Sequence, residues 1–391
     1  MRSLDAEVIV VGAGPAGSTT AALLAGAGRD VLVLDKATFP REKACAEFLS
    51  PGVEDVLARV GSLARVERAA PARPPGIEIR RGDDSHLVLY ENRRALGLRR
   101  SVFDAALVEH AVAEGARLLH ARATRAVVED GCVTGVDVRH ESEERRLRAS
   151  LVVGADGLHS VVARSLALDL APRWPQRLGL VARYSVEAPL PAAEMHVGVG
   201  AYCGLTPVDD GLVTASLVVG LDSKPSATSA RLFFELGLSR LTGAGGSLDG
   251  AVRIGSVRGL GPLARRVRRA SGRGFVLVGD AAGFLDPFTG EGVYRAVAGA
   301  ELAAAAIDRA LRTPERHALE YERMRASAFR DKERLCLLIQ ALLASGPVFG
   351  GALRRLGRRP ATARLLSGML GDYEHVPTRV VASHALTLLR A

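Results

Sequence analysis

Residues 7–35 constrain the fold of this chain more than any other stretch. An apolar run, EVIVV, leads into a glycine-rich turn, GAGPAG, then into a stretch of small residues, STTAALLAGAG, and a second apolar run, DVLVLD. Short apolar runs on either side of a helix-length segment predict a strand, a helix and a second, parallel strand. The sequence therefore predicts an α/β protein built on a Rossmann-type βαβ unit.

The turn of this unit also carries a binding motif. Gly12, Gly14 and Gly17 follow the spacing G-x-G-x-x-G, which allows a tight turn, close approach of the backbone to a pyrophosphate and close packing of helix on strand. Asp35 ends the second strand, where a carboxylate can bind a ribose diol. The predicted dinucleotide-binding residues are Gly12, Gly14, Pro15, Ala16, Gly17, Asp35 and Lys36.

Charge and cysteine content narrow the function classes. The formal net charge is +9, but no basic stripe is interleaved with aromatic residues, so the sequence predicts no nucleic-acid partner. The four cysteines lie far apart, without the spacing of a zinc site or a disulfide framework, so we expect no metal and a cytoplasmic location. These cysteines are Cys45, Cys132, Cys203 and Cys336.

One uncharged stretch bears on membrane association. Residues 335–353 read LCLLIQALLASGPVFGGAL, and Pro347 and three glycines interrupt them. The breaks favour a buried helical hairpin over a membrane-spanning segment. The basic sequence RRLGRR that follows leaves peripheral contact with a membrane as the alternative.

Three later stretches carry a resemblance to a known family. They are RSVFD (100–104), GADGLHS (154–160) and GDAAGFLDPFTGEG (279–292). Together with the glycine-rich turn, they resemble the FAD-dependent oxidoreductases of the para-hydroxybenzoate hydroxylase fold, which include geranylgeranyl reductases and flavin-dependent halogenases. The resemblance implies FAD as cofactor, and it implies that these residues contact it: Arg100, Asp156, Gly157, Gly279, Asp280, Pro287, Gly290, Gly292 and Val293.

The resemblance gives roles to two of these segments. Asp280 is expected to bind the ribityl hydroxyls of FAD. DPFTGEG is expected to bring backbone N–H groups and the N-terminus of a helix starting near Gly292 to the flavin ring. Such donors stabilise the negative charge of a reduced flavin.

A fourth stretch, FPREKACAEFLSPG, resembles the geranylgeranyl reductase-like branch of this family. The resemblance implies that Arg41 and Lys43 contact FAD and that Cys45 lies near its ring system, although a buried small residue is an equal interpretation of Cys45. Ala46 stands where the branch has glycine, so the local approach of the backbone departs from the pattern.

The substrate side matches the branch less well. Its prenyl reductases carry a Y-x-W-x-F-P-K strand, and the nearest match here, YCGLTPV, keeps only Tyr202 and Pro207. These two residues are the substrate-site candidates. Glu47 and His196, like Tyr202, could lie near the pocket, but each is interpreted as a structural or surface residue. The tryptophan-rich signature of the halogenases is also missing, since the single tryptophan, Trp174, lies elsewhere.

Three functions follow from the resemblance. The first interpretation is an FAD-dependent monooxygenase that uses NAD(P)H and O₂ to hydroxylate a lipophilic aromatic or polyketide-like molecule. The alternatives are an FAD-dependent ene-reductase of prenyl chains and a non-catalytic flavoprotein. No second dinucleotide motif is present, so NAD(P)H is expected to dock transiently, and no catalytic acid or base is predicted.

The expected architecture is two interleaved domains followed by helices. An FAD-binding domain is predicted from residues 1–75, 100–165 and 270–310, and a β-sheet substrate domain from 76–99 and 166–269. Residues 311–391 are predicted to form a C-terminal helical region. The sequence predicts no particular oligomeric state.

Overall fold

The βαβ unit is present as predicted, at the centre of a mainly parallel sheet. β1 (Ala6–Val11), α1 (Pro15–Gly26) and β2 (Val31–Asp35) follow one another, and β1 pairs in parallel with β2 and with β10 (Glu143–Gly154). Every residue of β1 except Glu7 is buried, which explains its continuous apolar run. This computed structural model describes residues 4–170, 174–209, 211–223, 229–243, 246–312, 318–377, 379–381 and 383–384.

Eight strands of the described chain join in this first sheet. Its path runs β18–β19–β10–β1–β2–β7, and a β8–β9 hairpin extends from β10. Asp130 and Gly131 form the turn of this hairpin, and both have the positive φ that a two-residue turn favours, 51° and 71°. The further bounds are β7 (Arg117–His120), β8 (Arg122–Glu129), β9 (Cys132–His140), β18 (Ser271–Gly272) and β19 (Phe275–Leu277).

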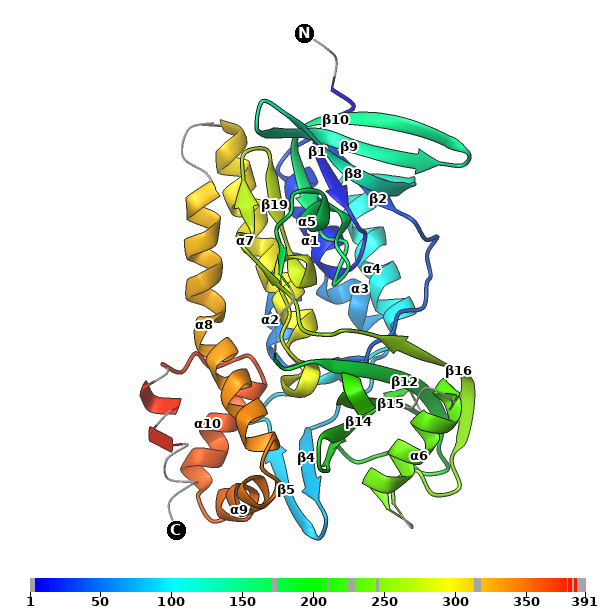
Figure 1. The fold of residues 1–391 in the computed structure, drawn as a ribbon, viewed down its shortest axis with the longest axis vertical. Helices are drawn as coiled ribbons and strands as arrows, with labels where there is room; N and C mark the ends of the chain where they lie inside the picture. Colours follow the sequence, from blue (N-terminus) through cyan, green and yellow to red (C-terminus); the bar gives the residue numbers. More distant parts are fainter. Residues whose placement is uncertain are drawn as a thin grey trace.

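Seven strands of the described chain form a second sheet, which lies below the first in Figure 1. Its order is β16–β12–β15–β14–β13–β4–β5; β13 and β4 pair in parallel, and the other neighbours are antiparallel. The chain crosses between the two sheets more than once, so the predicted interleaved α/β architecture is confirmed. The bounds are β4 (Gly76–Arg81), β5 (Asp84–Leu89), β12 (Arg177–Ser185), β13 (Ala193–Val197), β14 (Ala201–Asp209), β15 (Leu212–Gly220) and β16 (Val252–Leu260).

Within the described residues, two short ladders lie outside both sheets. β3 pairs antiparallel with β6, and β11 pairs antiparallel with β17. The exact residue limits of the predicted domains stay a prediction. The bounds are β3 (Phe48–Leu49), β6 (Leu96–Gly97), β11 (Asp169–Leu170) and β17 (Arg266–Val267).

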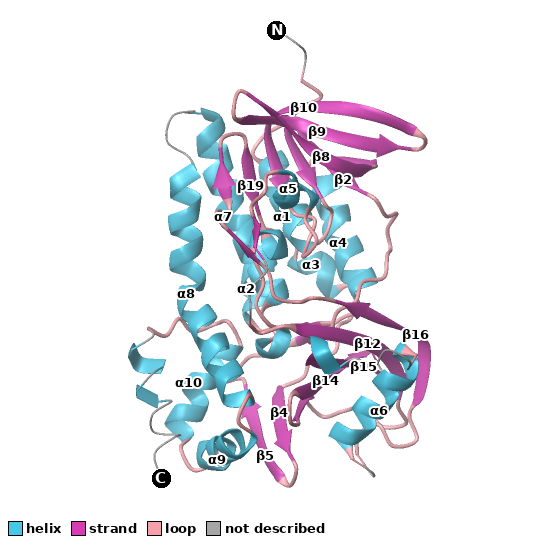
Figure 2. Ribbon diagram, viewed as in Figure 1, coloured by secondary structure: helices cyan, strands magenta, loops and turns pink. Residues whose placement is uncertain are grey.

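Helices pack beside the first sheet and link it to the second. α1 contacts both α4 (Arg100–Ala113) and α7 (Gly292–Arg312), and α8 (Ala318–Leu343) runs along the molecule from one sheet toward the other (Figures 1 and 2). The other helices are α2 (Gly52–Arg59), α3 (Leu63–Glu67), α5 (Val161–Ser165), α6 (Ala230–Thr242), α9 (Gly346–Leu356) and α10 (Pro360–Leu370), with short 3₁₀ turns at Leu221–Ser223, Gly279–Ala282 and Pro287–Thr289.

The uncharged stretch 335–353 is shared between α8 and α9. α8 ends at Leu343 and α9 begins at Gly346, directly before Pro347. The two helices are bent by 118° relative to each other at this interruption. No single helix in the described ranges is long and apolar enough to cross a membrane, whereas this bent pair passes the same test of length and composition. Its buried side chains pack with α10 and the second sheet in one apolar cluster, which includes Leu335, Ile339, Leu343, Phe349 and Leu353.

Candidate FAD and substrate site

A cavity of about 560 Å³ lies where four parallel strands end and the second sheet begins. Gly12, Asp35, Asp156 and Asp280 lie at or just beyond the carboxyl ends of β1, β2, β10 and β19, which is where open α/β sheets bind their ligands. Two predicted residues, Gly17 and Pro207, are not in its lining. Those that line it are Gly12, Gly14, Pro15, Ala16, Asp35, Lys36, Arg41, Lys43, Cys45, Arg100, Asp156, Gly157, Tyr202, Gly279, Asp280, Pro287, Gly290, Gly292 and Val293.

The glycines of the first turn each answer a different steric demand. Gly12 has a φ of +100°, and a Cβ there would stand 2.5 Å from the carbonyl oxygen of Ala155. A Cβ at Gly17 would meet the carbonyl oxygen of Gly12 at 1.8 Å, so this glycine serves the packing of α1 against the turn. A Cβ at Gly14 would meet only Arg41 within 4 Å, at 3.6 Å. The turn therefore leaves open backbone toward the cavity at Gly14, as a cradle for a pyrophosphate requires.

Asp35 fixes the same turn from the end of β2. Its carboxylate accepts hydrogen bonds from the backbone N–H of Ala13 at 2.8 Å and of Ala37 at 2.9 Å. These two bonds hold the glycine-rich turn after β1 beside the loop that follows β2. The side chain nevertheless lines the cavity, so its predicted contact with a ribose stays compatible with its place.

Three cations face the cavity beside these loops. Arg100, at the start of α4, donates to Asp104 from Nε at 2.7 Å and from Nη2 at 3.0 Å, and Nη1 of Arg41 lies 3.1 Å from the same carboxylate. Burial by itself would lower the pKa of Arg100, but Asp104 and Cys45 raise it above its ordinary value. Burial, reinforced by Arg100 and Arg41, lowers the pKa of the Lys43 ammonium. An anionic ligand here would relieve that repulsion.

Asp104, which the sequence analysis did not single out, holds two of these cations in place. Its side chain is fully buried, and it is the shared partner of Arg41 and Arg100. The signal was present in the sequence, because Asp104 is the last residue of the quoted motif RSVFD and lies one helical turn after Arg100.

The segment after β10 brings an incompletely satisfied carboxylate to the cavity. Oδ2 of Asp156 accepts a hydrogen bond from the backbone N–H of Val161 at 2.6 Å. Oδ1 is buried and has no hydrogen-bond partner among the described residues, and burial raises the pKa of the group. Gly157 follows with a φ of +80°. An unused buried acceptor of this kind suits a hydroxyl donor of a bound ligand.

The turn that follows β19 also lines the cavity, through Gly279 and Asp280. Asp280 lies in the 3₁₀ turn Gly279–Ala282, and its burial raises its pKa, although Lys43 and Arg100 oppose this. α7 begins at Gly292, as predicted, so its N-terminus lies at the cavity.

Asp286, in the turn DPFTGEG, joins this region to the second sheet. Its Oδ1 accepts from the backbone N–H of Phe288 at 3.0 Å and from the Tyr202 hydroxyl at 2.6 Å, and Oδ2 lies 3.3 Å from Nε of Arg177. Tyr202 therefore lines the cavity with its ring while its hydroxyl proton is engaged by Asp286. An aspartate directly before proline, at the start of a helical turn, was the signal for this capping role.

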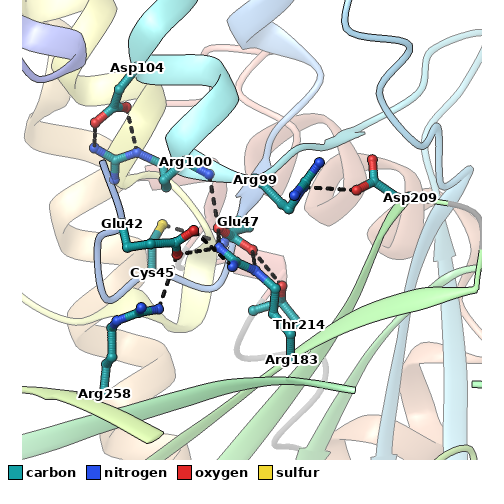
Figure 3. A network of polar contacts seen from close by, with 10 residues as sticks. All are labelled: Glu42, Cys45, Glu47, Arg99, Arg100, Asp104, Arg183, Asp209, Thr214 and Arg258. Carbon is teal, nitrogen blue, oxygen red and sulfur yellow. Dashed lines mark hydrogen bonds and ion pairs between the residues drawn. The ribbon is translucent and has the colours of Figure 1, made fainter. Parts of the chain in front are cut away.

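A polar network joins the loop that carries Glu42 and Glu47 and the start of α4 to the second sheet (Figure 3). At its centre is Glu47, whose side chain is 1% exposed and whose φ is +61°. Its carboxylate accepts from the backbone N–H of Arg100 at 2.9 Å, from the Thr214 hydroxyl at 2.6 Å, and from two nitrogens of Arg183. Of the two interpretations of Glu47, a structural or a surface residue, its burial matches the first. The left-handed residue of this loop is Glu47 and not Ala46, so the alanine at position 46 meets no strain from a positive φ.

The side of the cavity that the second sheet forms is mainly apolar, although Glu194, Thr206 and Ser216 also line it. Along β14, the residues that line the cavity are Tyr202, Gly204, Leu205 and Thr206, and Gly204 stands where prenyl reductases have tryptophan. Pro207 instead lies against β6, because a Cβ at Gly97 would meet its carbonyl oxygen at 1.7 Å. The apolar lining includes Phe48, Ile77, Leu180, Met195, Val218, Leu263, Phe284 and Phe288.

Comparison with protein families and curated sequences gives a consistent result. A family model described as FAD binding domain matches residues 5–334. Digeranylgeranylglycerophospholipid reductase 1 of Methanopyrus kandleri is 34% identical over 310 residues, which are 75% of this chain and 78% of that protein. The digeranylgeranylglycerophospholipid reductase of Methanosarcina mazei is 28% identical over 337 residues, 83% of this chain and 80% of the relative.

Solved structures with the same fold come from more than one kind of flavoprotein. A flavin-dependent brominase superposes with a TM-score of 0.81 at 21% identity and covers 98% of both chains. A geranylgeranyl bacteriochlorophyll reductase-like protein from Thermoplasma acidophilum has a TM-score of 0.77 at 23% identity, covering 98% of this chain and 95% of the other. These likenesses confirm the fold class inferred from the four motifs.

Proposed function

Because this chain belongs to the family of proteins with an FAD binding domain and is an FAD-dependent oxidoreductase, we propose that it reduces carbon–carbon double bonds in the isoprenoid chains of a lipid. The observation that carries this proposal is the reductase relative that is 34% identical over three quarters of the chain. The apolar half of the cavity supports it, since an isoprenoid chain offers only hydrocarbon surface.

The prediction of a monooxygenase is wrong. The curated relatives are prenyl-lipid reductases by name, which was the first alternative drawn from the sequence. The loss of tryptophan from the Y-x-W-x-F-P-K strand had argued against that alternative. In the structure the position belongs to Gly204, on the cavity face of β14, so the change removes bulk from the cavity rather than a reacting group.

The residues present fit FAD. The open backbone at Gly14 and the N-terminus of α1 would hold the pyrophosphate, with Arg41 and Lys43 supplying positive charge. The unpartnered Oδ1 of Asp156 offers an acceptor for a hydroxyl of the cofactor. Asp280 at the end of β19 would serve the ribityl chain.

When bound and reduced by an external donor, FAD would supply the two electrons that an alkene must gain, in the form of hydride. The side chains of the apolar half bind the isoprenoid chain and exclude water, and each buried CH₂ contributes about 0.8 kcal/mol to binding. Arg100, Lys43 and the N-terminus of α7 lie on the polar side, where they stabilise negative charge. Net reaction adds one hydride and one proton across the double bond. NAD(P)H as the external reductant remains part of the proposal.

An anaerobic reoxidation experiment tests the proposed function. The FAD-loaded protein is reduced with dithionite in the absence of oxygen, and a geranylgeranyl phospholipid is then added in detergent. The proposal predicts that the absorbance of oxidised flavin returns in proportion to the lipid added. A saturated phospholipid of the same head group is the control and should leave the flavin reduced. Reoxidation that needs oxygen and ignores the prenyl lipid would overturn the proposal.

A further inference from the structure

A second, smaller pocket lies among the C-terminal helices and has no place in the proposed function so far. Its volume is about 100 Å³, and it lies between α8, α9 and α10 with β4 on one side. Apart from Thr362 and His384, the described lining side chains are apolar. Those two are hydrogen-bonded to each other, Oγ1 to Nδ1, at 2.9 Å. We name this space the distal pocket; its lining includes Ile79, Ile339, Phe349, Ala352 and Leu366.

Phe288 separates the distal pocket from the main cavity, because its side chain lines both. Its ring meets Tyr202 edge to face with centroids 5.1 Å apart, and it meets Phe349 in the same way at 6.4 Å. The backbone N–H of Phe288 donates to Asp286, which fixes the backbone at this position. The ring of Phe288 can therefore move only by rotation of its side chain.

One strand, β4, contributes to both spaces. Ile77 lines the main cavity and Ile79 lines the distal pocket, and both are buried on the same face of β4. Two residues along a strand span about 7 Å, so a hydrocarbon chain extended along β4 would pass from one isoleucine to the other without leaving apolar surface.

We propose that the distal pocket receives the far end of the isoprenoid chain being reduced, with Phe288 as the movable partition between the two spaces. The inference rests on the proposed function, because it assigns a binding place to part of that substrate. The pocket presents no unsatisfied polar group of Thr362 or His384 to a ligand, so a hydrocarbon terminus matches it and a head group does not. Chains too short to reach the partition would gain nothing from the pocket.

Filling the distal pocket tests the inference. Ala352 on α9 is buried in its lining, and Ala352→Leu places additional methyl groups inside it. Ala361 on α10 is exposed and outside the lining, so Ala361→Leu is a matched control for the same chemical change. Dithionite-reduced protein is assayed anaerobically on geraniol and on geranylgeraniol in detergent. We expect Ala352→Leu to lower kcat/KM for geranylgeraniol at least tenfold relative to geraniol, and Ala361→Leu to keep the ratio of the unmodified protein.

The outcomes separate this inference from the function on which it rests. If the unmodified protein reduces both alcohols and Ala352→Leu leaves their ratio unchanged, the distal pocket is not part of the substrate site. If the unmodified protein reduces neither, the proposed function fails and the inference falls with it. Should Ala352→Leu not fold, Leu366→Phe fills the same pocket from α10, and the binding of phytanol, a saturated isoprenoid alcohol, is compared by thermal shift. Equal stabilisation of Leu366→Phe and unmodified protein would overturn the inference.

Discussion

Glu47 is a buried carboxylate whose loss of charge should have a large effect on stability. Glu47→Gln keeps the volume of the side chain but removes the charge that two nitrogens of Arg183, the Thr214 hydroxyl and the backbone N–H of Arg100 all contact. Removing one member of a buried ion pair costs about 3–5 kcal/mol. That is a large part of the roughly 5–15 kcal/mol by which domains are stable.

A second carboxylate of the same network, that of Glu42, provides a control for Glu47→Gln. Glu42 also accepts from Arg183, at 2.8 Å, and from Arg258, at 3.0 Å, but its side chain is 35% exposed. Exposed ion pairs contribute only about 0–1 kcal/mol, so Glu42→Gln should be nearly neutral. Urea unfolding followed by circular dichroism measures both variants. Equal losses of unfolding free energy in Glu42→Gln and Glu47→Gln would refute the assignment of the network's stability to the buried carboxylate.

Three further predictions concern the cavity. Gly12→Ala should abolish FAD retention, measured as flavin absorbance after gel filtration, because its Cβ would collide with Ala155; normal retention would contradict the cradle. Burial lowers the pKa of Lys43 and an anionic pyrophosphate would raise it again. FAD affinity should therefore be full below the lowered pKa and decline as the pH rises through the pKa of the complex. Lys43→Arg should lose this pH dependence of FAD affinity in a fluorescence titration. An identical pH profile in Lys43→Arg and in the unmodified protein would refute the role of Lys43. Tyr202→Phe should lower the free energy of unfolding by about 1.5–3 kcal/mol through the bond lost to Asp286, and an unchanged urea midpoint would count against that bond.

Local sequence patterns were sufficient for the cofactor half of the molecule. The glycine turn, Asp35 and the segment around Asp280 each join a strand end to a loop within a few residues, so motif spacing places them at one edge of the sheet. The Asp130–Gly131 hairpin and the start of α7 were predictable for the same reason, since turn chemistry and small residues act locally.

The substrate half depended on contacts between distant segments. Glu47 meets Arg183 and Thr214, which are 136 and 167 residues away, and Tyr202 meets Asp286 across 84 residues. The spacing of residues in the sequence does not predict contacts between segments so far apart. The reaction type was misjudged because the missing tryptophan was given more weight than the motifs shared with the reductase branch. In the structure, Gly204 occupies that position on the cavity face of β14.

The proposed reaction of this chain adds hydrogen, and not oxygen, to an isoprenoid lipid. The most direct test is mass spectrometry of a geranylgeranyl phospholipid after incubation with FAD-loaded, dithionite-reduced protein, in parallel with and without oxygen. The account predicts products heavier by pairs of hydrogen atoms in the oxygen-free sample. Products that gain an oxygen atom, and form only when oxygen is present, would contradict it.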